Sequence, residues 1–461
     1  MLIGWLFAVG QFVVGLNWIA TAFTYQAAMP AWLGWLAVVL LSFYLAAFLM
    51  IGVGVAWRLG RGTQLAFVLA LAGGWVLTDY LRSTMFTGFA WNPIGVALVD
   101  TPWLKVAPVV GTYGLSLLTV LMGGALWLLT RRNWRNGGSL ASVVALLTLW
   151  PATQLIEAKS AALPIRIIQP NIGQEVKWEE GFGDVAARRL QQLSITAGTD
   201  KPRLLFWPEV AIVEPMQDAR GPYAAAYTRS VRVGAAAVLR PGDTLLTGAV
   251  GLASRDKKTV YGSTNSVFVL DPSGKSLGRY DKAHLVPYGE YLPLRPLLSA
   301  IGLSQLAPGE GDTLYGPGPR TLQLPNGLKV GFQICYEIIF SGEVIDPANR
   351  PDVLFNPSND AWFGRWGPPQ HLAQAQLRAA EEGIPVIRST PTGISAVIDA
   401  HGRLLRSLPW RTAGVIDATL PPATKQPTLF ARTGNWLPLL LAALFLFTAI
   451  ALSRRARYRH I

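Results

Sequence analysis

The sequence has few charged residues, only one cysteine and long stretches without any ionisable side chain. Charged residues make up 15% of the 461 residues and hydrophobic residues 51%, whereas about a quarter of a typical soluble domain is charged. The first charged side chain is Arg58, so the preceding segment can hold two bilayer-spanning helices of about 20 residues each. The scarcity of charge argues against an ordinary soluble protein and predicts that much of the chain lies in a membrane.

The uncharged stretches predict six membrane spans. Two lie before Arg58, separated by a break near residues 24–30, and the others cover residues 62–78, 106–130, 138–156 and 433–453. Five spans therefore precede a long polar middle, and one follows it. We expect a membrane bundle over residues 1–157, a separate polar domain over 158–432, a final transmembrane helix over 433–453 and a basic cytoplasmic tail over 454–461.

The basic residues are concentrated at the ends of the predicted spans. They follow the second span (Arg58, Arg61), join the fourth and fifth (Arg131, Arg132, Arg135) and follow the last (Arg454, Arg455, Arg457, Arg459). Because short basic loops stay in the cytoplasm, these clusters predict that the polar middle lies outside it. The net charge of +13 then reflects topology, and a nucleic-acid or specific lipid site is the less favoured alternative.

The polar middle has the pattern of a mixed α/β domain. Short apolar runs bounded by Gly and Pro predict strands at 165–169, 203–207, 244–249, 266–270, 329–334, 353–356, 386–389 and 395–399. Helical periodicity predicts helices at 182–197, 223–236 and 369–382. Asp-Pro-Ser-Gly at 271–274 and Leu-Pro-Asn-Gly at 324–327 have the composition of hairpin turns. Helices should therefore cover sheets of largely buried strands.

Common metal and cofactor motifs are missing from the sequence. The four histidines are scattered without a His-Glu-x-x-His pair, and one cysteine cannot form a thiolate-rich zinc cluster. There is no Gly-x-Ser-x-Gly elbow and no glycine-rich phosphate loop. We therefore expect no metal and no cofactor, and the cysteine remains the candidate for chemistry.

Cys335 is the only cysteine and cannot form an intramolecular disulfide. A lone thiol is more often an inert core residue than a nucleophile, and a reactive thiol needs a base or a cation nearby. Two polar islands upstream contain such groups. Glu209 follows the apolar run at 204–207, and Lys282 lies in a loop-like stretch rich in Pro and Gly.

Three motifs together resemble a known catalytic triad. They are Trp-Pro-Glu at 207–209, Asp-Lys-Ala-His-Leu-Val-Pro-Tyr-Gly-Glu at 281–290 and Ile-Cys-Tyr-Glu at 334–337. In this order they resemble the Glu-Lys-Cys triad of the nitrilase superfamily. With the membrane spans, nearly the whole chain resembles the apolipoprotein N-acyltransferase family, the integral-membrane branch of that superfamily. The resemblance implies a multi-span α-helical membrane bundle plus an α/β nitrilase-like domain, a four-layer αββα sandwich.

The resemblance also implies roles for individual residues. Glu209, Lys282 and Cys335 would be catalytic. The motifs further match supporting positions at Glu290, Tyr336 and Glu337 and a substrate-contacting tryptophan at Trp178. His284, near the predicted catalytic lysine, is expected to be structural.

The function implied by the resemblance is N-acylation of the N-terminal diacylglyceryl-cysteine of apolipoproteins. A phospholipid such as phosphatidylethanolamine would donate the acyl chain in a ping-pong reaction through a thioester on Cys335. The resemblance further implies a bacterial inner-membrane protein whose catalytic domain faces the periplasm. We expect a monomer without a nucleic-acid partner. A membrane-tethered amidase, an N-acyltransferase for another amine, and a binding module with a relic site are the alternatives.

The residue types support this chemistry apart from the resemblance. A thiol beside a carboxylate base can attack an ester carbonyl, while a protonated lysine and a backbone N–H stabilise the oxyanion. The chain departs from the family in two respects. Family members typically have eight spans, whereas this chain is expected to start at the equivalent of the third, and Asp79 stands where a longer carboxylate is expected.

Overall fold

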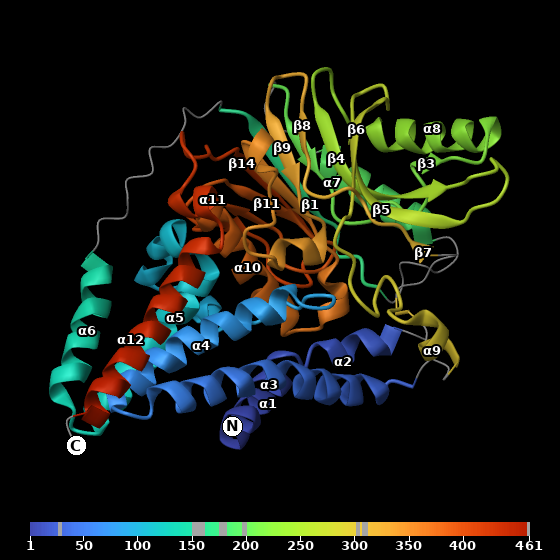
Figure 1. Ribbon diagram of the computed structural model, residues 1–461. Helices are drawn as coiled ribbons and strands as arrows, with labels where there is room; N and C mark the ends of the chain where they lie inside the picture. The colour runs from blue at the N-terminus through green and yellow to red at the C-terminus, as the bar shows by residue number, and fades with distance from the viewer. Residues whose placement is uncertain are drawn as a thin grey trace.

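Long apolar helices from both ends of the chain pack beside a two-sheet domain formed by the middle (Figure 1). The computed structural model describes residues 1–25, 30–149, 162–174, 182–195, 201–300, 305–306 and 312–458. The helical part and the sheets lie on opposite sides of the molecule, and α10 (Gly367–Glu382) lies between them (Figure 1).

Four described helical segments are long and apolar enough to cross a bilayer. They are α3 (Leu33–Gly60), α4 (Gln64–Thr84), the segment 102–130 formed by η3 (Pro102–Val106) and α5 (Ala107–Thr130), and α12 (Trp436–Tyr458). A fifth candidate combines α1 (Leu2–Gly15) with α2 (Ile19–Ala22) and η1 (Phe23–Tyr25), which are bent by 47° relative to each other.

The sequence predicted six spans. The described residues contain four, or five if the bent pair is counted as one span. The predicted span at 138–156 begins in α6 (Trp134–Leu149), which is too short to count by itself, and the rest lies in 150–161, outside the described residues. The predicted span at 62–78 is longer in the structure, because α4 continues past Asp79 to Thr84. Asp79 forms a buried ion pair with Arg82 at 3.1 Å, which makes both charges compatible with a packed helix.

Small residues bring the membrane helices into close contact. A Cβ atom on Gly52 of α3 would lie 2.9 Å from the carbonyl oxygen of Gly74 on α4, so any larger residue would push the helices apart. Close approach through small residues is typical of helix packing in lipid. It fixes α4, whose following loop contacts the catalytic domain.

The domain contains two β-sheets. The first has the order β14-β1-β2-β4-β5-β6, with β3 paired to β4 and β7 paired to β5. Its strands are β1 (Pro164–Gln169), β2 (Leu204–Phe206), β3 (Gln217–Asp218), β4 (Thr244–Ala253), β5 (Gly262–Leu270), β6 (Ser276–Asp281), β7 (Asp312–Thr313) and β14 (Gly414–Thr419). The second has the order β13-β12-β11-β10-β9-β8. Its strands are β8 (Thr321–Gln323), β9 (Lys329–Phe332), β10 (Val353–Pro357), β11 (Val386–Ser389), β12 (Ala396–Ile398) and β13 (Leu404–Ser407).

Alternating strand residues build the two cores that separate these layers. Phe206 of β2 lies between the sheets, with its ring centroid 5.0 Å from that of Phe355 on β10. Leu205 points to the opposite face, into a separate core shared with α7 (Phe182–Ile195) and α8 (Pro222–Ala236). Because α10 covers the second sheet, the layers are helix, sheet, sheet and helix. The predicted αββα sandwich is confirmed.

All of the predicted strands and helices of this domain are present, with ends shifted by a few residues. The two predicted turns join β5 to β6 and β8 to β9, which are antiparallel pairs. The prediction missed β3, β6, β7, β8, β13 and β14. It also missed α9 (Arg295–Ala300), α11 (Leu429–Thr433) and the short helices η2 (Ile94–Leu98), η4 (Cys335–Ile339), η5 (Pro347–Asn349) and η6 (Asp360–Phe363).

The membrane helices contact the domain directly behind η4. In the loop after α4, the carbonyl of Gly88 accepts a hydrogen bond from Tyr336 Oη at 3.4 Å. Trp91 Nε1 donates to Gln370 Oε1 of α10 at 2.8 Å. Thr112 of α5 donates its backbone N–H to Glu381 Oε1 of α10 at 2.6 Å. The segment that carries the only cysteine is therefore packed against the membrane part of the chain.

Candidate active site

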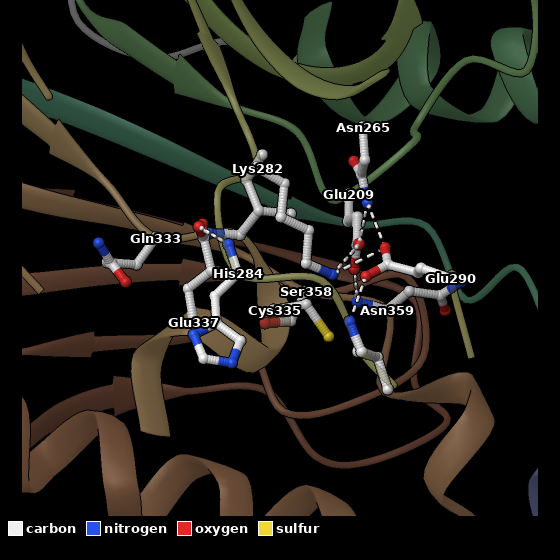
Figure 2. A network of polar contacts seen from close by, with 12 residues as sticks. Glu209, Asn265, Lys282, His284, Glu290, Gln333, Cys335, Glu337, Ser358 and Asn359 are labelled. Carbon is white, nitrogen blue, oxygen red and sulfur yellow. Dashed lines mark hydrogen bonds and ion pairs between the residues drawn. The ribbon is translucent and has the colours of Figure 1, made fainter. Parts of the chain in front are cut away.

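The three residues of the predicted triad lie together where strands of both sheets end (Figure 2). Glu209 follows β2, Lys282 follows β6 directly, and Cys335 begins η4 after β9. Their exposed fractions are 6%, 1% and 5%. Because the two sheets face each other, residues far apart in sequence meet at one edge of the sandwich, shielded from water.

The charged groups of this cluster are not equivalent. Lys282 Nζ lies 2.8 Å from Glu290 Oε1 but 3.7 Å from Glu209 Oε1. Glu209 is held by amides: Asn265 Nδ2 donates to Oε1 and the Asn359 N–H donates to Oε2, each at 2.6 Å. Glu290 thus forms the direct ion pair with the lysine, and Glu209 keeps a fixed orientation at the edge of that pair.

The electrostatics favour a charged lysine and a neutral thiol. Burial opposes the charge of Lys282, but the neighbouring carboxylates Glu290 and Glu209 outweigh it, so the pKa of Lys282 lies above its usual range. Burial, and then the charge of Glu209, raise the pKa of Cys335 well above its ordinary value. A thiol in this state becomes nucleophilic when a base removes its proton during attack.

Cys335 has an unusual backbone conformation. Its φ of 51° lies in the left-handed region, which costs a non-glycine residue roughly 1–2 kcal/mol. The conformation makes a sharp bend between β9 and η4. Such strain persists only where the surrounding structure holds it, and it is concentrated at functional sites.

Glu337 fastens the two loops on which the lysine and the cysteine lie. Its Oε1 accepts from the Ala283 N–H at 2.7 Å, the His284 N–H at 3.1 Å and Tyr280 Oη at 2.8 Å, and its Oε2 accepts from the Ile334 N–H at 2.7 Å. Burial raises the pKa of Glu337 to about 7, against the effect of these hydrogen bonds. Its contacts with backbone on both sides of the site are those of an orienting residue.

The remaining predicted residues lie around this centre, except one. Tyr336 is 3% exposed and faces the loop after α4. The His284 ring is stacked on Phe340 at 3.8 Å, and its Nε2 is 3.3 Å from the Thr87 carbonyl oxygen, so the ring of this histidine contacts the loop after α4. Trp178 lies outside the described residues.

Two amide-bearing residues of the site were missed by sequence reasoning. Asn265 lies in the polar first half of β5, before the apolar run 267–270, and bridges Glu209 to Glu290, with 3.2 Å to the latter. Asn359 follows β10, in the stretch Ser-Asn-Asp-Ala-Trp-Phe-Gly at 358–364. A polar residue within a strand, or directly after a buried one, was the available signal.

The described residues contain no group of three or more His, Cys, Asp or Glu side chains arranged to hold a metal ion. The ionisable groups around Cys335 include one lysine between two carboxylates. This combination suits proton transfer and oxyanion stabilisation more than metal coordination, for which several ligands must converge on one point.

Two family models together match most of the chain. Residues 159–428 match the carbon-nitrogen hydrolase family, and residues 1–125 match the apolipoprotein N-acyltransferase N-terminal domain. A mutant of the Nesterenkonia AN1 amidase from the nitrilase superfamily is 21% identical and has a TM-score of 0.36, covering 57% of this chain and 93% of that one.

Two curated relatives match over nearly the full chain. The apolipoprotein N-acyltransferase of Rhodopseudomonas palustris is 35% identical over 98% of this chain and 85% of that protein. That of Sinorhizobium medicae is 39% identical over 93% of this chain and 80% of that protein. The chain therefore belongs to the apolipoprotein N-acyltransferase family, with a carbon-nitrogen hydrolase domain behind a membrane bundle.

Proposed function

We propose that this protein transfers an acyl chain from a phospholipid to the N-terminal amine of diacylated apolipoproteins, through a thioester on Cys335. The observation that carries the proposal is the buried thiol beside Glu209 and Lys282, on a segment that contacts the loop after α4 through Tyr336. Family membership supplies the reaction type. The geometry supports Glu209, Lys282 and Cys335 as the residues that carry it out.

In the first half-reaction Glu209 accepts the thiol proton as the sulfur of Cys335 attacks an ester carbonyl of the phospholipid. The resulting oxyanion is stabilised by the Lys282 ammonium, an interaction worth roughly 2.7–4 kcal/mol per donor. The intermediate collapses to a thioester. The departing lysophospholipid oxygen takes the proton from Glu209, so the base is restored.

In the second half-reaction the α-amino group of the acceptor attacks the thioester. Glu209 accepts the amine proton, and the sulfur of Cys335 leaves as a thiolate. Glu209 then passes the proton to this thiolate. The products are an amide and the free thiol of Cys335. One carboxylate therefore serves both steps, which agrees with its fixed orientation between two amide donors.

The supporting residues have distinct tasks in this scheme. Glu290 keeps Lys282 charged through the 2.8 Å ion pair. Glu337 fixes the backbone on either side of the site, and Tyr336 forms part of the wall towards the membrane-side loop. We include Trp178 as a contact of the lipid substrate.

The membrane bundle explains why lipids are the proposed substrates. A diacyl donor and a lipidated acceptor must both leave the bilayer to react, and a domain packed on transmembrane helices can receive them without crossing water. The protein belongs to the bacterial inner membrane. We propose that its catalytic domain faces the periplasm, that phosphatidylethanolamine serves as donor and that a monomer suffices.

The test is transfer by the purified protein in phosphatidylethanolamine-containing micelles to a diacylated lipopeptide. Acylated lipopeptide and lysophospholipid should form in equal amounts. Soluble amides serve as the competing substrates, because the carbon-nitrogen hydrolase domain makes a membrane-tethered amidase the second candidate. Turnover of the amides without lipopeptide acylation would establish that alternative instead.

A further inference from the structure

A fully buried histidine lies behind the proposed nucleophile. His371 on α10 has an exposed fraction of 0%, and its Nε2 is 3.0 Å from the carbonyl oxygen of Cys335. A carbonyl oxygen can only accept a hydrogen bond. The contact therefore requires a proton on Nε2.

The other ring nitrogen lies within a buried charged pair. Nδ1 is 3.0 Å from both Arg388 Nη2 and Asp360 Oδ1. The same Nη2 lies 2.7 Å from each oxygen of Asp360. Burial, and then the charge of Arg388, lower the pKa of His371, so the ring is neutral. A neutral ring with its proton on Nε2 accepts at Nδ1, and Arg388 is the donor in place.

Aromatic rings fix the plane of this imidazole. The Trp91 and Phe363 ring centroids lie 5.1 and 5.6 Å from that of His371. Trp91 belongs to the loop after α4, and its own carbonyl accepts from Arg82 Nη1 at 2.8 Å. The histidine is therefore clamped between the second sheet and the membrane-side loop.

From this arrangement we propose that His371 is a positioning residue for acyl transfer. Its Nε2–H holds the carbonyl of Cys335 and so keeps the nucleophile in the left-handed conformation that directs the thiol into the site. Arg388, which has Nη2 at 3.0 Å from Nδ1, is the donor that favours this tautomer. The role rests on the proposed function, because it acts through the thiol that accepts the acyl chain.

Three substitutions separate the hydrogen bond from the packing. His371→Gln can place an amide N–H near the Nε2 position, His371→Asn reaches only as far as Nδ1, and His371→Phe keeps a ring without donors. We expect the maximal rate of Cys335 acylation by phosphatidylethanolamine to fall roughly 10- to 100-fold in the Asn and Phe variants, as for other misplaced reacting groups. The KM for phospholipid should stay unchanged, and the Gln variant should recover most of the rate.

A second measurement reads the thiol without any lipid. Cys335 is the only cysteine, so iodoacetamide can alkylate no other thiol. The alkylation rate should be lower in the Asn and Phe variants than in the wild type, and the Gln variant should recover most of it. Equal rates in Gln, Asn and wild-type protein, or a change confined to KM, would overturn the proposal. If the Phe variant does not fold, the Gln and Asn pair decides. If wild-type protein takes up no acyl chain, the proposed function fails while the alkylation series still tests His371.

Discussion

The two ends of β2 carry charged clusters of opposite balance. At the amino end Asp243 is bonded by two arginines, with Oδ2 3.3 Å from Arg203 Nε and 3.5 Å from Arg240 Nε. At the carboxyl end a single lysine lies between Glu209 and Glu290, with a thiol beside them. The first cluster has more cation than anion, and the second has more anion than cation.

This difference separates a structural cluster from one suited to proton transfer. The amino-end carboxylate also accepts the backbone N–H groups of Arg203 and Arg240, at 3.0 and 3.1 Å, so both of its oxygens are held by donors. Glu209 is 3.7 Å from the only lysine of its cluster, and it faces a thiol that keeps its proton. A carboxylate beside a thiol that keeps its proton can act as a base.

The largest expected effect is that of removing the base. Glu209→Gln should lower the rate of Cys335 acylation by roughly 10²- to 10⁴-fold, because the raised pKa of the thiol leaves little thiolate without a base. Single-turnover mass spectrometry measures this rate. The partly exposed Glu214 provides the control, since Glu214→Gln should acylate normally. A Glu209→Gln protein that acylates at the wild-type rate would remove Glu209 from the mechanism.

Lys282→Met should have the next largest effect. Loss of the ammonium removes one oxyanion donor, which costs about 10²- to 10³-fold in rate. The exposed lysine in the β5–β6 turn supplies the control, Lys275→Met, which should leave the rate unchanged. Comparable rates for the two variants in the same single-turnover assay would contradict the role given to Lys282.

At the amino end of β2 the prediction concerns stability. Arg203→Met leaves Asp243 with Arg240 and removes a hydrogen bond to the Ser194 carbonyl at 2.8 Å, so it should destabilise the domain by on the order of 3 kcal/mol. The Tm should fall, and the acylation rate of folded protein should not change. A loss of rate at unchanged Tm would show that this comparison of the two ends is wrong.

The buried carboxylate of Glu382 on α10 extends the comparison, and the effect expected there depends on pH. Burial, and then Glu381, raise the pKa of Glu382 to about 7, while Arg350 at 3.8 Å opposes the shift weakly. The unfolded chain releases this proton near pH 4.5 and the folded chain only near pH 7, so stability declines as pH rises between these values. The decline should amount to about 3 kcal/mol.

Glu382→Gln should abolish that decline. The variant should have the Tm of the wild type at about pH 4.5 and a higher Tm at about pH 8, because a neutral amide has no proton to release between these values. Its acylation rate should be unaffected. Melting curves of both proteins across this pH range provide the measurement. Parallel dependence of Tm on pH in the two proteins would contradict the raised pKa.

The sequence predicted strands that are buried on both faces and begin with a run of apolar residues, such as β2 and β10, because such a run leaves a clear signal. It missed β13, whose residues are all exposed, and β14, because exposed edge strands carry no such pattern. It placed a first span before residues 24–30 but did not indicate the 47° bend after α1. The apolar composition of the first helices contains no information about that bend.

At the site, the ionisable residues were predictable and their partners were not. Glu209, Lys282 and Cys335 lie in recognisable motifs, and the structure brings them together. The contacts of Asn265, Asp360 and His371 join the two sheets and α10. These contacts depend on the folded structure, and the spacing of residues along the chain does not reveal them. The positive φ of Cys335 is likewise a property of the packed structure, since cysteine has no general preference for it.

The most direct test of the account is the intact mass of the purified protein after incubation with phosphatidylethanolamine of one defined chain length. The account predicts the addition of a single acyl group on Cys335, its loss when a diacylated lipopeptide is added, and no addition in Cys335→Ala. An unchanged wild-type mass while lipopeptide acylation proceeds, or an acyl group retained in the Ala variant, would contradict it.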